Sequence, residues 1–159
     1  MKNLKIEFKW AVIFIIMMLV WMLLEKLAGL HDENIDKHSV YTNFVAIPAV
    51  AVYVLALLDK KKNFYDGKMS YMQGFKTGLI ITVIVTIVSP LTQYITSTFI
   101  TPDYFSNVTE FAVKEGKMTK EEALNFFNLK SYIMQGLIGA ALMGIVTSAI
   151  VAFFTKSKI

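Results

Sequence analysis

Long runs of apolar residues, separated by shorter polar segments, dominate the pattern along this chain. A helix needs about 20 mostly apolar residues to cross the roughly 30 Å hydrocarbon core of a bilayer. Four segments meet this requirement: residues 10–30, 40–58, 77–100 and 132–154. A soluble protein would have too little polar chain left to cover four such helices. The pattern therefore predicts four transmembrane helices.

The connection between the third and fourth apolar segments is long and has the composition of a folded segment. Pro102 stands near the first turn of one expected helix, and Gly116 ends that helix. Thr119 and Glu122 have the spacing of a capping box, which indicates the start of a second helix. Aromatic and aliphatic residues line both helices, as in helices that lie at a membrane surface. We therefore expect an amphipathic helical hairpin over about residues 102–128, either on the outer membrane surface or covering the bundle as a lid.

Together these elements predict an all-α integral membrane protein. It has four transmembrane helices plus an extracytoplasmic amphipathic helical hairpin between spans three and four. A length of 159 residues indicates about one domain, so we expect a single four-helix membrane domain over residues 1–159.

The distribution of lysine predicts how the helices are oriented. All 16 basic residues are Lys, and the formal net charge is +4. Basic residues accumulate in the cytoplasmic loops of membrane proteins. If both termini are cytoplasmic, ten lysines lie on the cytoplasmic side and six on the other. We therefore expect both termini in the cytoplasm.

Missing residue types exclude several classes of function. The chain has no Cys, so disulfides, thiolate metal sites and cysteine nucleophiles are excluded. It also has no Arg, which argues against specific binding of nucleic acid. The sequence contains no glycine-rich phosphate loop and no serine nucleophile motif. We therefore expect neither an enzyme nor a bound cofactor.

Small residues recur at intervals of four in and around the third and fourth apolar segments. Such ladders let helix backbones approach closely in lipid, where the hydrophobic effect does not drive helix association. The residues expected in this contact are Gly74, Gly78, Gly136, Ala140, Gly144 and Ser148. We predict that they pack the two antiparallel helices together, with a contact between two copies of the chain as the alternative.

The expected span lengths draw one ionisable residue into the lipid. A first helix ending before Glu25 would be too short to cross the bilayer, so this carboxylate is expected in the outer third of the membrane. Four other polar residues lie at a similar expected depth: Asn43, Gln93, Tyr94 and Gln135. The five form a hypothetical polar site if their helix faces converge. Alternatively, Glu25 accepts hydrogen bonds from the amides and holds the bundle together.

His31 and His38 lie in the loop after the first apolar segment, with three carboxylates between them. Imidazole and carboxylate groups are both ligands of divalent transition metals. Their spacing matches no helical ligand pair, so we interpret the loop as a solvated acidic turn. We assign no metal site to it, and leave open whether it binds a metal.

Several residues and short motifs along the chain form a recognisable set. They are Glu25 with Gly29 and His31, Tyr41-Thr42, Pro48, and residues 69–78, 102–105 and 118–123. This set resembles a family of small bacterial membrane proteins catalogued as domain of unknown function 4199. The resemblance implies a four-helix inner-membrane protein and assigns no activity, cofactor, partner or catalytic residue.

These observations favour a structural or accessory role in the cell envelope. The expected partners are the lipid bilayer and either further copies of the chain or the other subunits of a membrane complex. The alternative is a small transporter or channel that uses Glu25 and the polar residues near the outer surface.

Overall fold

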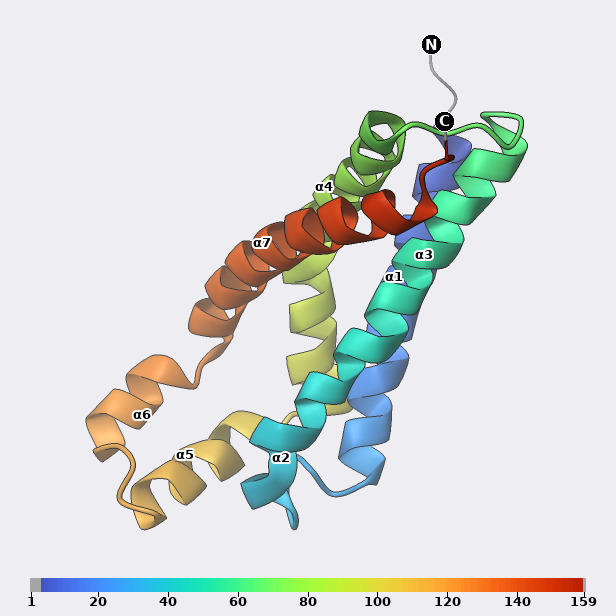
Figure 1. Cartoon of the computed structure of the whole chain (residues 1–159). Helices are drawn as coiled ribbons and strands as arrows, with labels where there is room; N and C mark the ends of the chain where they lie inside the picture. The colour runs from blue at the N-terminus through green and yellow to red at the C-terminus, as the bar shows by residue number, and fades with distance from the viewer. Residues whose placement is uncertain (1–3, 159) are drawn as a thin grey trace.

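The computed structural model describes residues 4–158, and this part of the chain is helical with no β-strand. Within it, four helical stretches are long and apolar enough to cross a membrane. They are α1 (Lys5–Leu27), the stretch Ile35–Asn63, the stretch Tyr71–Ile100, and α7 (Leu129–Thr155). The start of α1 and the end of α7 lie at one end of the bundle, and the short helices α2, α5 and α6 lie at the other (Figure 1). The chain is an all-α membrane protein with four spans, as its hydropathy predicts.

Three of the helices begin or end away from the predicted positions because of local capping. Helix α1 ends at Leu27, since Gly29 takes a left-handed φ of +72° and Leu30 N–H donates to the Glu25 carbonyl. Helix α4 (Tyr71–Ile95) starts earlier than predicted because Ser70 forms a capping box with Gln73. Helix α7 starts early for a similar reason, since the Asn128 side chain accepts from Ser131 N–H.

The second span is a continuous helical path with a tighter segment in it. Helix α2 (Ile35–Tyr41) leads into a 3₁₀ turn (Thr42–Val45) and then into α3 (Ala46–Asn63). Pro48 lies in the first turn of α3, where it cannot donate to the carbonyl four residues earlier. The residue that carries this carbonyl, Phe44, lies in the 3₁₀ turn.

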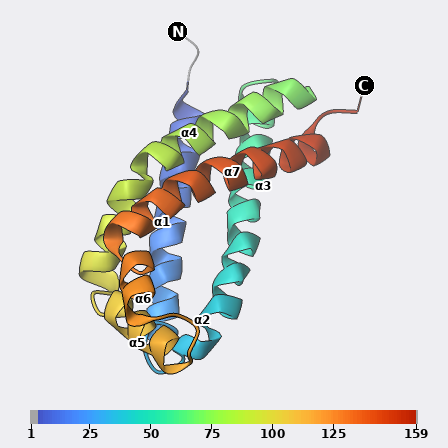
Figure 2. The ribbon, with the colours of Figure 1, turned by 90° about the vertical axis from the view of Figure 1, so that its left-hand side faces the viewer.

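Pro90 lies inside α4, where its missing N–H leaves the carbonyl of Thr86 without its usual helical donor. The Ser89 hydroxyl donates to that carbonyl instead, at 2.9 Å. The first half of α4 runs beside α7 at an angle to α1 and α3, and its second half turns to run along α1 (Figure 2). Helix α4 then continues as a π-helical turn, Thr96–Ile100.

Helices α4 and α7 form the closest helix pair in the bundle, and small residues lie between them. Gly78 faces Ser148 and Gly144 faces Thr82, with too little room for a Cβ at either glycine. Gly136 is different, because a Cβ there would meet nothing within 4 Å. A Cβ at Gly74 would also meet Ala152 at 3.3 Å, so the small-residue contact joins two helices of one chain from Gly74 to Gly144 and does not extend to Gly136.

A polar network crosses the middle of this packed region. The hydroxyls of Tyr53 on α3 and Thr82 on α4 lie 2.8 Å apart, and Ser148 of α7 lies 3.4 Å from Thr82. The Thr82 and Ser148 hydroxyls also donate to carbonyls one turn back in their own helices. Because each hydroxyl has a single proton, the Tyr53–Thr82 hydrogen bond joins α3 to α4, and Ser148 of α7 only contacts Thr82. No charged group takes part.

The outward faces of the four spans are apolar. Large side chains such as Ile47, Ile87, Leu91 and Phe154 are strongly exposed. A monomeric soluble protein rarely exposes so large a continuous apolar surface. This surface is the one expected against lipid tails.

Helices α5 (Tyr104–Lys114) and α6 (Lys120–Phe126) lie in the connection between α4 and α7, and they contact each other. Gly116, at a φ of +64°, ends α5, and the Thr119–Glu122 capping box starts α6, as predicted. Val108 and Ala112 are the buried residues of α5, and Ala123 is that of α6.

Candidate functional site

Glu25 lies in the last turn of α1 and is 2% exposed. Trp21, one turn earlier on the same helix, donates from its indole N–H to Glu25 Oε1 at 2.6 Å. Residues four apart on a helix share a face, so this bond follows directly from the sequence spacing. It holds one carboxylate oxygen and leaves Oε2 for other partners.

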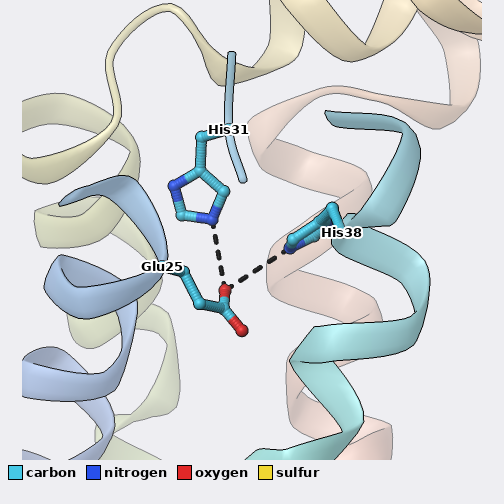
Figure 3. A group of neighbouring side chains, drawn as sticks. All are labelled: Glu25, His31 and His38. Atoms are coloured by element: carbon cyan, nitrogen blue, oxygen red, sulfur yellow. Dashed lines mark hydrogen bonds and ion pairs between the residues drawn. The ribbon is translucent and has the colours of Figure 1, made fainter. Parts of the chain in front are cut away.

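Two imidazoles approach that second oxygen. His31 Nε2 lies 3.2 Å and His38 Nε2 3.4 Å from Glu25 Oε2 (Figure 3). The turn at Gly29 brings His31 back over the end of α1, and α2 carries His38. His31 is only 3% exposed, so the interpretation of this loop as a solvated turn is wrong for this histidine, whereas the His38 side chain is 18% exposed. The loop's approach to α1 depends on tertiary packing, which sequence spacing does not report.

Helix α5 packs over Glu25, His31 and His38. The hydroxyl of Tyr104 lies 3.3 Å from His38 Nδ1, and the Asn107 amide donates to the His31 carbonyl at 3.0 Å. The rings of His31, His38 and Tyr104 meet edge to face, with centroids 5.1–5.3 Å apart. Burial raises the pKa of Tyr104 above its ordinary value, so its hydroxyl stays neutral.

Glu25, His31 and His38, which we call the carboxylate–histidine cluster, each offer one ligand atom, and these atoms lie within 4.8 Å of one another. Such a set can share a proton, hold the helix ends together, or bind a cation. On the sequence alone, Glu25 and the two histidines were separate candidates, and nothing indicated that they meet. The sequence pattern that could have indicated this site is the pair of histidines with carboxylates between them.

The structure does not join the other members of the hypothetical polar site to Glu25. Asn43 donates to the carbonyl of Ser39, and Gln135 donates to the hydroxyl of Ser131. Gln93 donates to Ser97, and Tyr94 is exposed. The three amides bond within their own helical stretches, so their faces do not converge on the Glu25 carboxylate.

A second buried carboxylate lies near the opposite end of α1. Lys60 of α3 donates to Glu7, with Nζ 2.8 Å from Oε1, and both residues are at most 3% exposed. Lys9 and the Trp10 indole both donate to Asp59 beside this pair. Helix α1 is thus tied to the second span near both of its ends. On the sequence alone, Lys60 is one of the ten lysines expected on the cytoplasmic side, and nothing marks Glu7 as its partner.

The helix lengths, the apolar outer surface and the buried polar groups define a four-span integral membrane protein. The chain belongs to the family described as "Protein of unknown function (DUF4199)", which matches residues 9–157. Comparisons with curated proteins and with solved structures found no match.

Proposed function

We propose that this protein is a non-enzymatic structural or accessory component of a bacterial inner membrane. Its working unit is a homo-oligomer or a larger membrane complex. Buried pairs of charged and polar groups near both ends of α1 give the bundle the fixed shape that such a component needs.

The environment of Glu25 carries this proposal. A carboxylate that transports ions exchanges its protein partners for the ion in every cycle. Glu25 is buried, and Trp21, His31 and His38 engage its two oxygens. These contacts connect α1 to the following loop and to α2. They support a role in holding the helices together over a role in transport.

The proposed orientation places both termini in the cytoplasm. The lysine-rich loop after α3 lies at the same end of the bundle as the C-terminal tail (Figure 1). An excess of lysine on this side supports the orientation. Helices α5 and α6 then lie on the extracytoplasmic side, and the amphipathic pattern of α5 supports a place at the lipid surface.

A flux measurement tests the proposed role. The purified full chain is placed in liposomes that contain dyes for H⁺, Na⁺ and K⁺, and ion gradients are then applied. We expect fluxes equal to those of protein-free liposomes. The small transporter would be established instead by three results together: the wild type carries a flux, Glu25→Gln abolishes it, and Glu33→Gln does not.

Two further measurements test the remaining parts of the proposal. Alkaline phosphatase fused after Lys62 should be inactive, and fusions within residues 101–131 should be active. Extraction of native membranes in mild detergent should give one defined assembly larger than a single chain. High phosphatase activity after Lys62 contradicts the proposed orientation. A monomer in native membranes contradicts the proposed assembly.

A further inference from the structure

We propose that Glu25, His31 and His38 form a binding site for a divalent transition-metal ion, with Zn²⁺ as the favoured ion. The site lies between the end of α1, the loop after it and α2, and α5 covers it (Figure 3). This proposal is independent of the structural or accessory role, because a bound ion is compatible with either a fixed bundle or a transporter.

The donor set is the first argument. Two imidazole nitrogens and one carboxylate oxygen are ligands typical of zinc sites, and such three-ligand sites leave a fourth position for water or another ligand. Magnesium and calcium prefer sites made of oxygen atoms, and the cluster supplies a single carboxylate. The chemistry of the cluster therefore favours Zn²⁺ over the hard cations.

The distances are the second argument. Zinc binds nitrogen and oxygen ligands at about 2.0–2.1 Å in tetrahedral geometry, which puts two ligand atoms about 3.3 Å apart. The two imidazole nitrogens lie 3.2 and 3.4 Å from Glu25 Oε2. The two imidazole nitrogens lie within 4.8 Å of each other, so binding an ion requires at most a closing of the two rings to about the same spacing.

The surrounding contacts are the third argument. Metal ligands in proteins are oriented by hydrogen bonds on their far side. Trp21 holds Glu25 Oε1, which leaves Oε2 for the ion. Tyr104 lies against His38 Nδ1, which leaves Nε2 for the ion. Asn107 holds the backbone of His31 by its carbonyl, so α5 supports both histidines.

Access to the site is available from one side. The His38 side chain is 18% exposed, whereas those of Glu25 and His31 are at most 4% exposed. The fourth ligand position is therefore expected beside His38, and an ion can enter there without opening the α1 helix.

Metal titration of the full chain tests the site. The protein is purified in detergent, freed of its affinity tag, stripped with EDTA, and titrated with Zn²⁺ and with Co²⁺. We expect one Zn²⁺ per chain, no competition from excess Mg²⁺, and Co²⁺ absorption bands of a four-coordinate nitrogen and oxygen site. Wild-type protein that binds no Zn²⁺ under these conditions overturns the proposal.

Variants assign the ligands. His38→Ala alters the most exposed member of the cluster, and we expect it to lower Zn²⁺ affinity by more than the about 10–100-fold typical of changes outside the ligands. Glu25→Gln and His31→Ala should have the same effect. Glu33→Gln is the matched control, because it neutralises an exposed carboxylate in the same loop, and it should bind Zn²⁺ as wild type does.

One measurement needs no substitution, so the proposal remains testable if the variants fail to fold. The ring nitrogens of His31 and His38 are followed by ¹⁵N NMR in the wild type during the Zn²⁺ titration. Coordination moves both Nε2 resonances together as one equivalent is added. A titration that moves neither resonance, or full Zn²⁺ binding by folded His38→Ala and His31→Ala proteins, overturns the proposal.

Discussion

Gly144 of α7 lies directly against Thr82 of α4, and a Cβ at position 144 would overlap the Thr82 side chain. This close approach has a consequence beyond van der Waals packing. It brings Ser148, one turn further along α7, to 3.4 Å from the hydroxyl of Thr82, which also meets Tyr53. The absence of a side chain at one position therefore permits hydroxyl groups of three helices to meet at one place.

Replacing Gly144 with alanine should destabilise the bundle, because the added methyl group overlaps Thr82. The cost of such overpacking is about 1–3 kcal/mol in the free energy of unfolding. Gly136→Ala is the matched control on the same helix. It meets open space and gains helix propensity, so it should be neutral or slightly stabilising. Unfolding in detergent, followed by circular dichroism, measures both, and equal stability of the two variants would contradict the observed contact.

Glu7→Gln should strongly destabilise the protein. The change leaves the Lys60 ammonium buried without its carboxylate, and breaking a buried pair in this way costs about 3–5 kcal/mol. Replacing both residues with apolar ones, as in Glu7→Leu with Lys60→Met, should recover much of that loss. The same unfolding measurement compares the three proteins. A single variant as stable as wild type would show that the pair does not hold α1 to α3.

Tyr104→Phe should weaken the proposed Zn²⁺ site without removing a ligand. The change removes the hydroxyl beside His38 Nδ1, and loss of such an orienting contact lowers metal affinity by about 10–100-fold. Tyr94→Phe, which alters an exposed tyrosine of α4, is the control and should bind Zn²⁺ normally. Calorimetric titration with Zn²⁺ measures both affinities. Unchanged affinity in Tyr104→Phe would show that the Tyr104 hydroxyl does not orient His38.

Acid should loosen the start of α6. The backbone N–H and hydroxyl of Thr119 donate to Glu122 and hold the pKa of its carboxyl below the ordinary 4.5. Because the folded-state pKa is lowered, this stabilisation is complete above pH 4.5 and is lost as the pH falls through the folded-state pKa. The Thr119 amide resonance in NMR should shift over that range in the wild type. In Glu122→Gln the shift should be absent, and its persistence would assign the titration to another group.

Local features of the sequence predicted much of the fold. The four spans follow from runs of apolar residues long enough to cross a bilayer, and the start of α6 follows from the spacing of Thr119 and Glu122. Helix ends were less predictable. Helix α1 stops at Leu27 because Gly29 adopts a left-handed conformation, which the apolar pattern through Leu30 does not reveal.

The candidate site was accessible to sequence reasoning only in part. Glu25 attracted attention because span length draws it into the lipid, and Trp21 shares its helix face at a spacing of four. Asn43, Gln93 and Gln135 were grouped with Glu25 by depth alone. Depth along a helix axis says nothing about which face a side chain occupies, and these amides bond within their own helical stretches.

By itself, the sequence determined that this chain lies in a membrane with four helices, because length and hydropathy are properties of each segment alone. Only the tertiary structure decided that His31 and His38 meet the Glu25 carboxylate, and that Lys60 meets Glu7. The physical reason is that these contacts join separate elements. They depend on the turn at Gly29, on the packing of α2 and α3 against α1, and on the cover that α5 provides.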